Sequence, residues 1–180
     1  MTPRQRRLRA DFDRIISEFS AHPYISVNYN AETGIPEQYF IEYKNIKGLK
    51  QTSDSSPQNR KTEITTNHRT EIYLHADYPR VKPVCYMLSD IFHPNFRMAH
   101  PHDICIGDYW ASGETLADVI YMIGEMIQYK NFSSKNPLNG VAAKWAMENQ
   151  SIFPVDETNI RIGDEDLRLQ NKIDIEIKSN

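Results

Sequence analysis

The chain has 180 residues, of which 39% are hydrophobic and 25% are charged, and its formal net charge is -3. Single domains typically span about 100–200 residues, so this composition predicts one globular domain, and the slight acidic excess gives no reason to expect nucleic acid as a partner. No apolar run approaches the roughly 18 residues of a membrane span, and no apolar stretch follows the N-terminal arginines as in a secretory signal. We therefore expect a cytoplasmic protein that does not contact a membrane.

The first predicted element is an amphipathic helix that ends near Phe19. Apolar residues recur there at helical spacing and give the helix one apolar stripe. The opening turns carry four arginines: Arg4, Arg6, Arg7 and Arg9. Cations at a helix N-terminus oppose the helix macrodipole. We therefore expect these side chains to be exposed, either as a solvated face or as a basic surface for a partner.

Strands are predicted next, over residues 24–29, 39–46, 62–76 and 84–88, where apolar and polar residues alternate or the run is nearly all apolar. Residues 50–58 are polar and Ser-rich without any period, which is typical of a loop. Because no helix interrupts the strands, they indicate an antiparallel meander joined by hairpins.

Two helices are predicted in the second half. The first covers residues 116–127, and Thr115 with Asp118 fits a capping box at its start. The second covers residues 141–149 and follows a Pro-Leu-Asn-Gly turn. The order of helix, strands and helices predicts an α+β domain in which helices cover a sheet.

We expect this domain to span residues 1–152 and a C-terminal extension to span residues 153–180. The extension is polar and acidic. Near its end, three isoleucines alternate with charged residues as in an edge strand: Ile173, Ile175 and Ile177.

The connection between the last strand and the first of these two helices, residues 89–115, is the most unusual segment. It holds three of the six histidines and one of the two cysteines: His93, His100, His102 and Cys105. A connection this long in a compact domain is usually functional. Three kinds of site fit its residues.

A metal site is one reading, because histidine and cysteine are zinc ligands. Closely spaced ligands usually sit on one helix or strand, however, and two His-Pro pairs interrupt both, so we expect no metal. A cysteine hydrolase with Cys105 as nucleophile and His102 or His100 as base is the second reading. In the third, Cys105 is an acyl-accepting thiol and nearby amide donors stabilise the oxyanion.

The third reading is supported by a resemblance. His93-Pro94-Asn95, followed by Asp103-Ile104-Cys105-Ile106-Gly107, resembles the catalytic signature of ubiquitin-conjugating enzymes. Residues 77–83 (DYPRVKP) resemble the family's YP-x-x-PP segment, and residues 136–143 (NPLNGVAA) resemble its PLN…AA connection. The motifs stand in the family's order, and the resemblance covers roughly residues 3–150.

The resemblance implies a fold with an N-terminal helix, a four-stranded meander and C-terminal helices, and a transferase that needs no cofactor. Cys105 would accept a ubiquitin-like protein from an activating enzyme and pass it to a lysine of a target protein. Asn95 would donate to the oxyanion or brace the loop, while His93 would be structural rather than a general base. We expect Trp110 to anchor the core and Cys85 to be an inert buried thiol.

The sequence also departs from the family pattern. Asn136 stands where the family often has an acidic residue that orients the incoming lysine. Asp103, Asp108 or His102 are the candidates to replace it, His102 because an ordinary imidazole titrates near pH 6.5. The loop after Trp110 lacks the proline that many eukaryotic members present to ligases.

These departures are similar to the bacterial branch of the family, whose members often act in antiphage defence. Because the family's first helix meets the activating enzyme, the resemblance also suggests that the four arginines bind this partner. The alternatives are an inactive module of the same fold that only binds ubiquitin-like proteins and, as an outsider, the cysteine hydrolase.

Overall fold

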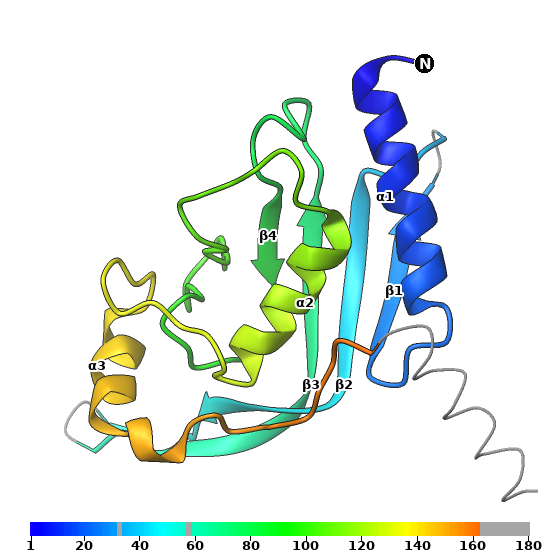
Figure 1. Cartoon of the computed structure of the whole chain (residues 1–180). Coiled ribbons are helices and arrows are strands. Elements are labelled where there is room, and N and C mark those ends of the chain that lie inside the picture. Colours follow the sequence, from blue (N-terminus) through cyan, green and yellow to red (C-terminus); the bar gives the residue numbers. More distant parts are fainter. Residues whose placement is uncertain (32–33, 57–58, 163–180) are drawn as a thin grey trace, which may run out of the picture.

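The structure, a computed structural model, describes residues 1–31, 34–56 and 59–162. The four strands pair antiparallel in chain order, α2 lies against one face of the sheet, and α1 lies beside α2 and β1 (Figure 1). The predicted α+β class and the meander are confirmed. In chain order the elements are α1 (Pro3–Phe19), β1 (Ile25–Asn30), β2 (Gln38–Gln51), β3 (Thr62–Tyr73), β4 (Val84–Met87), α2 (Leu116–Ile127), α3 (Gly140–Glu148) and the short 3₁₀ helix η1 (Gln150–Ile152).

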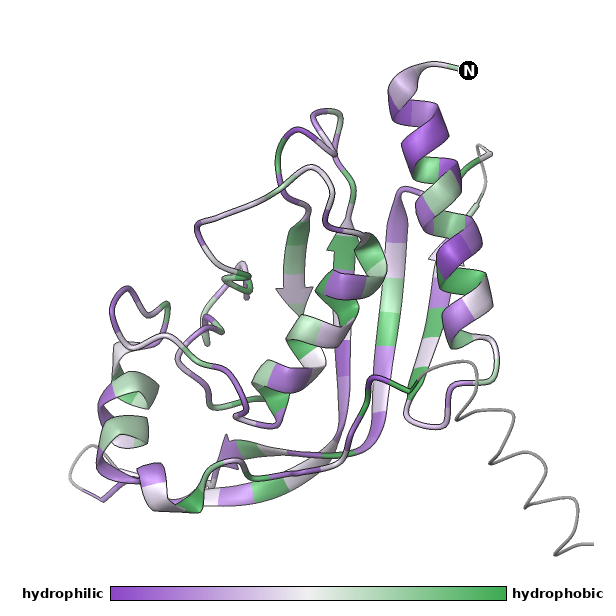
Figure 2. Cartoon of the chain, in the orientation of Figure 1, coloured by the Kyte–Doolittle hydropathy of each residue, from purple (hydrophilic) through white to green (hydrophobic). Residues whose placement is uncertain are grey.

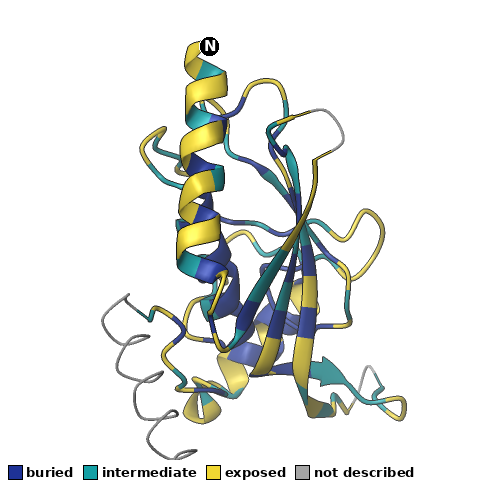
Figure 3. Ribbon diagram, turned by 90° about the vertical axis from the view of Figure 1, so that its right-hand side faces the viewer, coloured by how far each residue is buried: buried dark blue, intermediate teal, exposed yellow. Residues whose placement is uncertain are grey.

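Helix α1 begins at a capping box. The Thr2 hydroxyl accepts from the Gln5 amide, and the Gln5 side chain accepts from the Thr2 amide at 2.8 Å. Pro3 occupies the first turn, where its missing N–H costs no hydrogen bond. These features offset the unfavourable arginine charges at this end. One stripe of the helix is buried and the opposite face is exposed (Figure 3).

Strand β2 is longer than predicted because it continues through a bulge. Its register with β3 shifts between Lys44 and Gly48, and Asn45 has a positive φ of 57°. The two strands bend there and run on toward α3 (Figure 1). Beyond the bulge, Leu49 packs with Phe92 on the loop after β4 and with residues of α3 in a second, smaller core cluster.

The main core lies between α2, α1 and the sheet. Helix α2 carries few hydrophilic residues (Figure 2), and most of its side chains are buried. The buried Tyr43 hydroxyl of β2 donates to the Ile120 carbonyl of α2 at 2.7 Å. Over the described residues, none of the helices is both long and apolar enough to cross a membrane.

Residues 153–162, which we call the C-terminal strap, pack on the domain rather than leaving it. Ile160 is buried in the main core. The Asp156 carboxylate accepts from the Lys47 amide at the bulge of β2, at 2.7 Å, and the His22 ring donates from Nε2 to the Ile160 carbonyl at 2.9 Å. The packed domain thus continues through residue 162, and the predicted edge strand at Ile173–Ile177 lies outside the described residues.

Candidate functional site

Cys105 lies on a short extended segment beside β4. The Ile104 amide donates to the Cys85 carbonyl at 2.9 Å, and the Met87 amide donates to the His102 carbonyl at 2.8 Å. Asp103 forms an isolated antiparallel bridge with Tyr86. The segment therefore extends the sheet beyond β4, and this pairing fixes the position of Cys105 next to the strand.

Asn95 and Cys105 are connected by two hydrogen bonds. The Cys105 amide donates to the Asn95 carbonyl at 2.9 Å, and Asn95 Nδ2 donates to the Cys105 carbonyl at 3.1 Å. The same side chain accepts at Oδ1 from the Ser133 amide at 2.8 Å. Asn95 is buried, and both hydrogen bonds of its side chain are partly shielded from solvent. Its side chain thus braces the cysteine segment against the connection between α2 and α3.

The α2–α3 connection is also held to the loop by Asn139. The Asn139 amide donates to the Pro94 carbonyl at 3.0 Å, while the Asn139 side chain caps α3 by accepting from the Ala142 amide at 3.0 Å. The Asn139 end of the Pro-Leu-Asn turn is thereby fixed, and Leu138 lines the groove that contains Cys105.

This groove has a volume of about 320 Å³ and opens to solvent. Its walls come from the β3–β4 connection, from β4 and from the α2–α3 connection. The lining residues used below are His75, Val81, Lys82, Pro83, Val84, Asp103, Cys105 and Leu138. We refer to it as the Cys105 groove.

The two cysteines differ in access. Cys105 is partly exposed, whereas Cys85 is buried in the core, where burial raises the pKa of its thiol to about 12. The thiolate is the reactive form of cysteine. Of the two thiols, Cys105 is therefore the one that solvent reaches, and Cys85 is the buried thiol expected from the sequence.

His93 is fully buried and is not placed to transfer a proton to substrate. Its Nδ1 accepts from the Asn95 amide at 3.1 Å, and its ring packs 4.4 Å from that of Tyr129, between centroids. Burial lowers the pKa of His93 to about 3, so the ring stays neutral. This burial fits the structural role that the resemblance suggests and leaves His93 out of the candidate catalytic residues.

Asp103 is held in an ion pair with Arg97. The Arg97 guanidinium bonds both carboxylate oxygens of Asp103, and the Arg97 amide donates to the Asp103 carbonyl at 3.0 Å. The hydrogen bond from Arg97 lowers the pKa of the Asp103 carboxyl group. Residues 98–102 project between them and are exposed. The chain from Arg97 to Asp103 thus forms a closed loop within the interval between Asn95 and Cys105.

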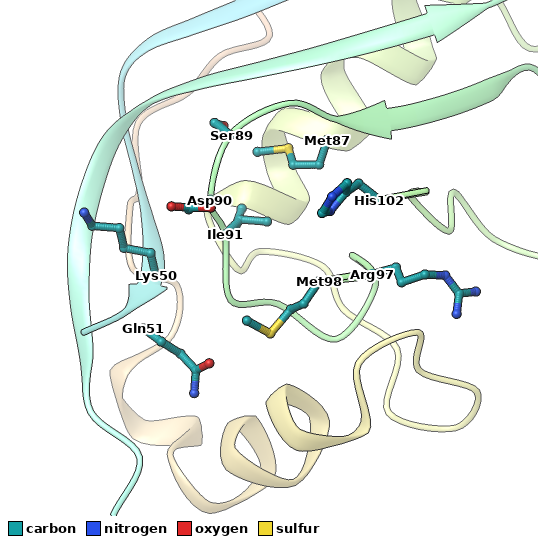
Figure 4. A pocket seen from close by; sticks show the side chains of 9 residues that line it. All are labelled: Lys50, Gln51, Met87, Ser89, Asp90, Ile91, Arg97, Met98 and His102. Carbon is teal, nitrogen blue, oxygen red and sulfur yellow. The ribbon is translucent and has the colours of Figure 1, made fainter. Parts of the chain in front are cut away.

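The two other candidates for proton transfer lie outside the Cys105 groove. The His102 side chain lines a separate cavity of about 250 Å³, together with Met87 and Met98 (Figure 4). Asp108 is exposed and has no ion pair within the described ranges. Those ranges also hold no group of three or more His, Cys, Asp or Glu side chains placed to bind a metal ion.

Trp110 has the anchoring role expected from the sequence. Its indole Nε1 donates to the Pro79 carbonyl at 2.8 Å, and its ring lies 6.1 Å from that of Tyr78, between centroids. It is packed against the main core. Trp110 therefore joins the loop that follows Cys105 to the β3–β4 connection.

The arginines of α1 divide into two pairs. Arg4 is bound to Glu37 at 2.7 Å and to two backbone carbonyls, and Arg7 is bound to Asp11 at 2.8 Å and to the carbonyls of Ser112 and Glu114. The expectation of exposure is wrong for this pair, because these side chains join α1 to the loops. Arg6 and Arg9 are exposed and remain the candidates for partner binding.

Sequence reasoning missed Arg97 and Lys82. Arg97 closely follows the His-Pro-Asn motif, and the opposite charges of Arg97 and Asp103 were the sequence signal that could have predicted an ion pair between them. Lys82 belongs to the quoted DYPRVKP segment, but only the fold brings it to the Cys105 groove.

The sequence matches no protein-family model and no curated protein. The structure is similar to that of a novel ubiquitin-conjugating enzyme, with a TM-score of 0.54 and 19% identity over 83% of this chain and 89% of that one. A candidate ubiquitin-conjugating enzyme from Plasmodium yoelii gives a TM-score of 0.57 and 17% identity over 86% of this chain and 90% of that one. A candidate ubiquitin-conjugating enzyme from Trypanosoma cruzi gives a TM-score of 0.56 and 16% identity over 83% of this chain and 94% of that one. The chain therefore has the fold of ubiquitin-conjugating enzymes.

Proposed function

We propose that this protein is a ubiquitin-conjugating-like transferase. It accepts a ubiquitin-like protein from an activating enzyme as a thioester on Cys105 and passes it to an amine of a target protein. The observation that carries the proposal is the placement of Cys105. Its thiol is partly exposed in an open groove, while its main chain is bound on both sides by Asn95.

Each transfer passes through a tetrahedral intermediate. The Cys105 thiolate attacks the carbonyl carbon of the incoming thioester, and the bond to the activating enzyme's sulfur breaks. An amine then attacks the new thioester, and the Cys105 sulfur leaves. Fixed donors that meet the oxyanion lower both barriers, and losing one such donor typically costs about 10²–10³ in rate. The Asn95 Nδ2 has two hydrogens, of which one is bound by the Cys105 carbonyl.

The incoming amine must lose a proton. The side chains that could accept this proton differ in exposure and in whether they are already bound to another residue. The Asp103 carboxylate is held by Arg97, and the neutral His93 is buried. His102 lines the other cavity. We propose Asp108 as the carboxylate that orients the amine, because it is exposed three residues after Cys105 and has no ion pair among the described residues, although it does not line the Cys105 groove itself.

The exposed pair Arg6 and Arg9 is our candidate contact for the activating enzyme. Basic side chains on a helix steer an acidic partner surface mainly through the association rate. Reversing both charges should slow charging of Cys105 at low salt, and the effect should fade as salt is added. Equal charging rates at low salt would remove this contact from the proposal.

The transferase is tested by mixing the protein with an activating enzyme, a ubiquitin-like protein and ATP, followed by non-reducing gels. We expect a thiol-sensitive adduct with the wild type and none with Cys105→Ala. Cys105→Ser should give an oxygen ester that survives thiol treatment. Cys85→Ala is the matched control and should keep the adduct, because that thiol is buried.

Two other outcomes identify the alternatives. A protein that binds the ubiquitin-like partner but forms no adduct is a binding module of the same fold. A protein that releases the partner from a C-terminal ester in a Cys105-dependent manner, without an activating enzyme, is a hydrolase. An adduct lost in Cys85→Ala and kept in Cys105→Ala would overturn the site assignment.

A further inference from the structure

We propose that Lys82 makes the Cys105 groove selective for a protein tail with acidic or uncharged residues near its C-terminus, and against a basic tail. This inference rests on the proposed function, because it concerns the tail that would be joined to Cys105. It adds a specificity-determining residue and names the chemistry of the modifier that the groove accepts.

The first observation is where the ammonium group lies. Lys82 lines the Cys105 groove, and its Nζ donates to the carbonyl of Gly107, two residues after Cys105. The backbone at Lys82 is fixed as well. His75 Nδ1 accepts from the Asp77 amide at 3.2 Å, so Nε2 carries the hydrogen and donates to the Lys82 carbonyl at 2.9 Å. The positive charge is thus held beside the cysteine segment.

The second observation is that no carboxylate among the described residues is paired with this ammonium group. Lys82 has no ion pair in the part of the chain that the structure describes. The acid that lines the groove, Asp103, is paired with Arg97. An ammonium has three hydrogens, and the Gly107 carbonyl takes one. Lys82 therefore leaves two donors and a net positive charge for a bound chain.

The third observation is the character of the walls. Val81, Pro83, Val84 and Leu138 line the groove with apolar surface. Clefts with apolar walls focus the field of a charge that lines them. An extended chain advances about 3.3 Å per residue, so the last few residues of a tail joined to Cys105 lie within the reach of Lys82. A glutamate there is attracted and an arginine is repelled.

The test uses synthetic peptides and needs no activating enzyme. Two short peptides end in Gly-Gly as the ethyl thioester and differ only in carrying glutamate or arginine before the glycines. The Cys105 thiolate attacks the thioester carbonyl, the bond to sulfur of ethanethiol breaks, and the departing thiolate takes up a proton from water. Mass spectrometry of the intact protein follows acylation over time, and Cys105→Ala reports reaction at any other group.

We expect the wild type to react about three- to tenfold faster with the glutamate peptide at low salt, as for one charge pair in a partly exposed site. The preference should shrink in 0.5 M salt, to a degree set by screening over roughly 4–5 Å. Lys82→Arg should keep it, Lys82→Met should abolish it, and Lys82→Glu should reverse it. Lys144→Glu is the matched control, because this exposed lysine on α3 lines another cavity.

The outcomes separate the two claims. Equal rates for both peptides with the wild type, or a preference that survives Lys82→Met, overturn the selectivity and leave the proposed function standing, since Cys105 is still acylated. If Cys105 is acylated by neither peptide, the proposed function fails and the selectivity fails with it.

Discussion

Arg7 and Asp11, one turn apart on α1, form an ion pair whose acidic side is almost completely buried. Arg7 Nε lies 2.8 Å from Asp11 Oδ2, and the Asp11 side chain is 2% exposed. The same carboxylate accepts from the Tyr78 hydroxyl at 2.6 Å and from the Leu116 amide at 3.2 Å. One side chain of α1 thus caps α2 and holds the β3–β4 connection that borders the Cys105 groove.

Removal of the charge partner should therefore destabilise the protein. Arg7→Met leaves the Asp11 carboxylate buried without its cation, and breaking a buried pair in this way costs about 3–5 kcal/mol. We expect about 2–4 kcal/mol here, because Arg7 is partly exposed, measured as the free energy of unfolding in urea. Arg6→Met, on the exposed side of α1, should stay within about 0.5 kcal/mol. If the free energy of unfolding falls equally in the two variants, the Arg7–Asp11 pair does not contribute to stability.

Asn95→Ala tests whether the amide braces the cysteine segment. The variant removes two partly buried hydrogen bonds, from the Ser133 amide and to the Cys105 carbonyl, at a cost of about 0.5–1.5 kcal/mol each. We expect a lower melting temperature and slower formation as well as slower discharge of the thioester. Asn136→Ala, at an exposed amide of the α2–α3 connection, is the control and should change neither. If stability is unchanged and only discharge of the thioester is slower, Asn95 stabilises the oxyanion and does not brace the segment.

The elements could be predicted from the sequence where local chemistry decides them. Helix α2 begins at the predicted capping box, in which Asp118 accepts from the Thr115 amide at 3.0 Å. The bounds of the predicted helices agree closely with α2 and α3. The second strand was predicted to end at Ile46, because the bulge at Asn45 breaks the alternation of side chains that marks a strand.

The site could be predicted only where a motif carries it. Cys105 and Asn95 stand in such a motif, and the fold brings them together. His102 is near Cys105 in sequence, but its backbone has a positive φ of 62°, so the chain turns there and the side chain lines the other cavity. Arg7 looks like a solvated helix residue in sequence, because its acceptors Ser112 and Glu114 are distant backbone carbonyls.

Gly124 of α2 allows the C-terminal strap to pack closely against the helix, because it has no side chain. A Cβ atom at this position would lie 2.5 Å from Ile160 Cδ1 and 3.0 Å from Tyr43 Cε1. We expect Gly124→Ala to lower stability by about 1–3 kcal/mol through overpacking, although alanine favours helix by about 1 kcal/mol. Ile160→Val removes the clashing atom, so the double variant should recover part of the loss. Thermal unfolding of the wild type, the two single variants and the double variant measures this coupling. Strictly additive effects would mean that the strap does not pack against Gly124.

Stability should fall as the pH is lowered through 6.5, because three buried histidines are neutral in the folded protein. They are His22, His68 and His93. Burial lowers the pKa of all three, that of His93 to about 3. The unfolded chain, with pKa values near 6.5, binds more protons below that pH. Each histidine therefore removes up to about 1.4 kcal/mol of stability per pH unit until its folded pKa is reached.

Urea unfolding between pH 5 and 7.5 measures this slope. The carboxyl groups with lowered pKa, such as those of Asp103 and Asp156, protonate in the unfolded chain only near pH 4, so they contribute little in this window. A free energy of unfolding that stays flat from pH 7.5 to 5 would mean that the buried rings accept protons in the folded protein. The neutral state assigned to His93 would then be wrong.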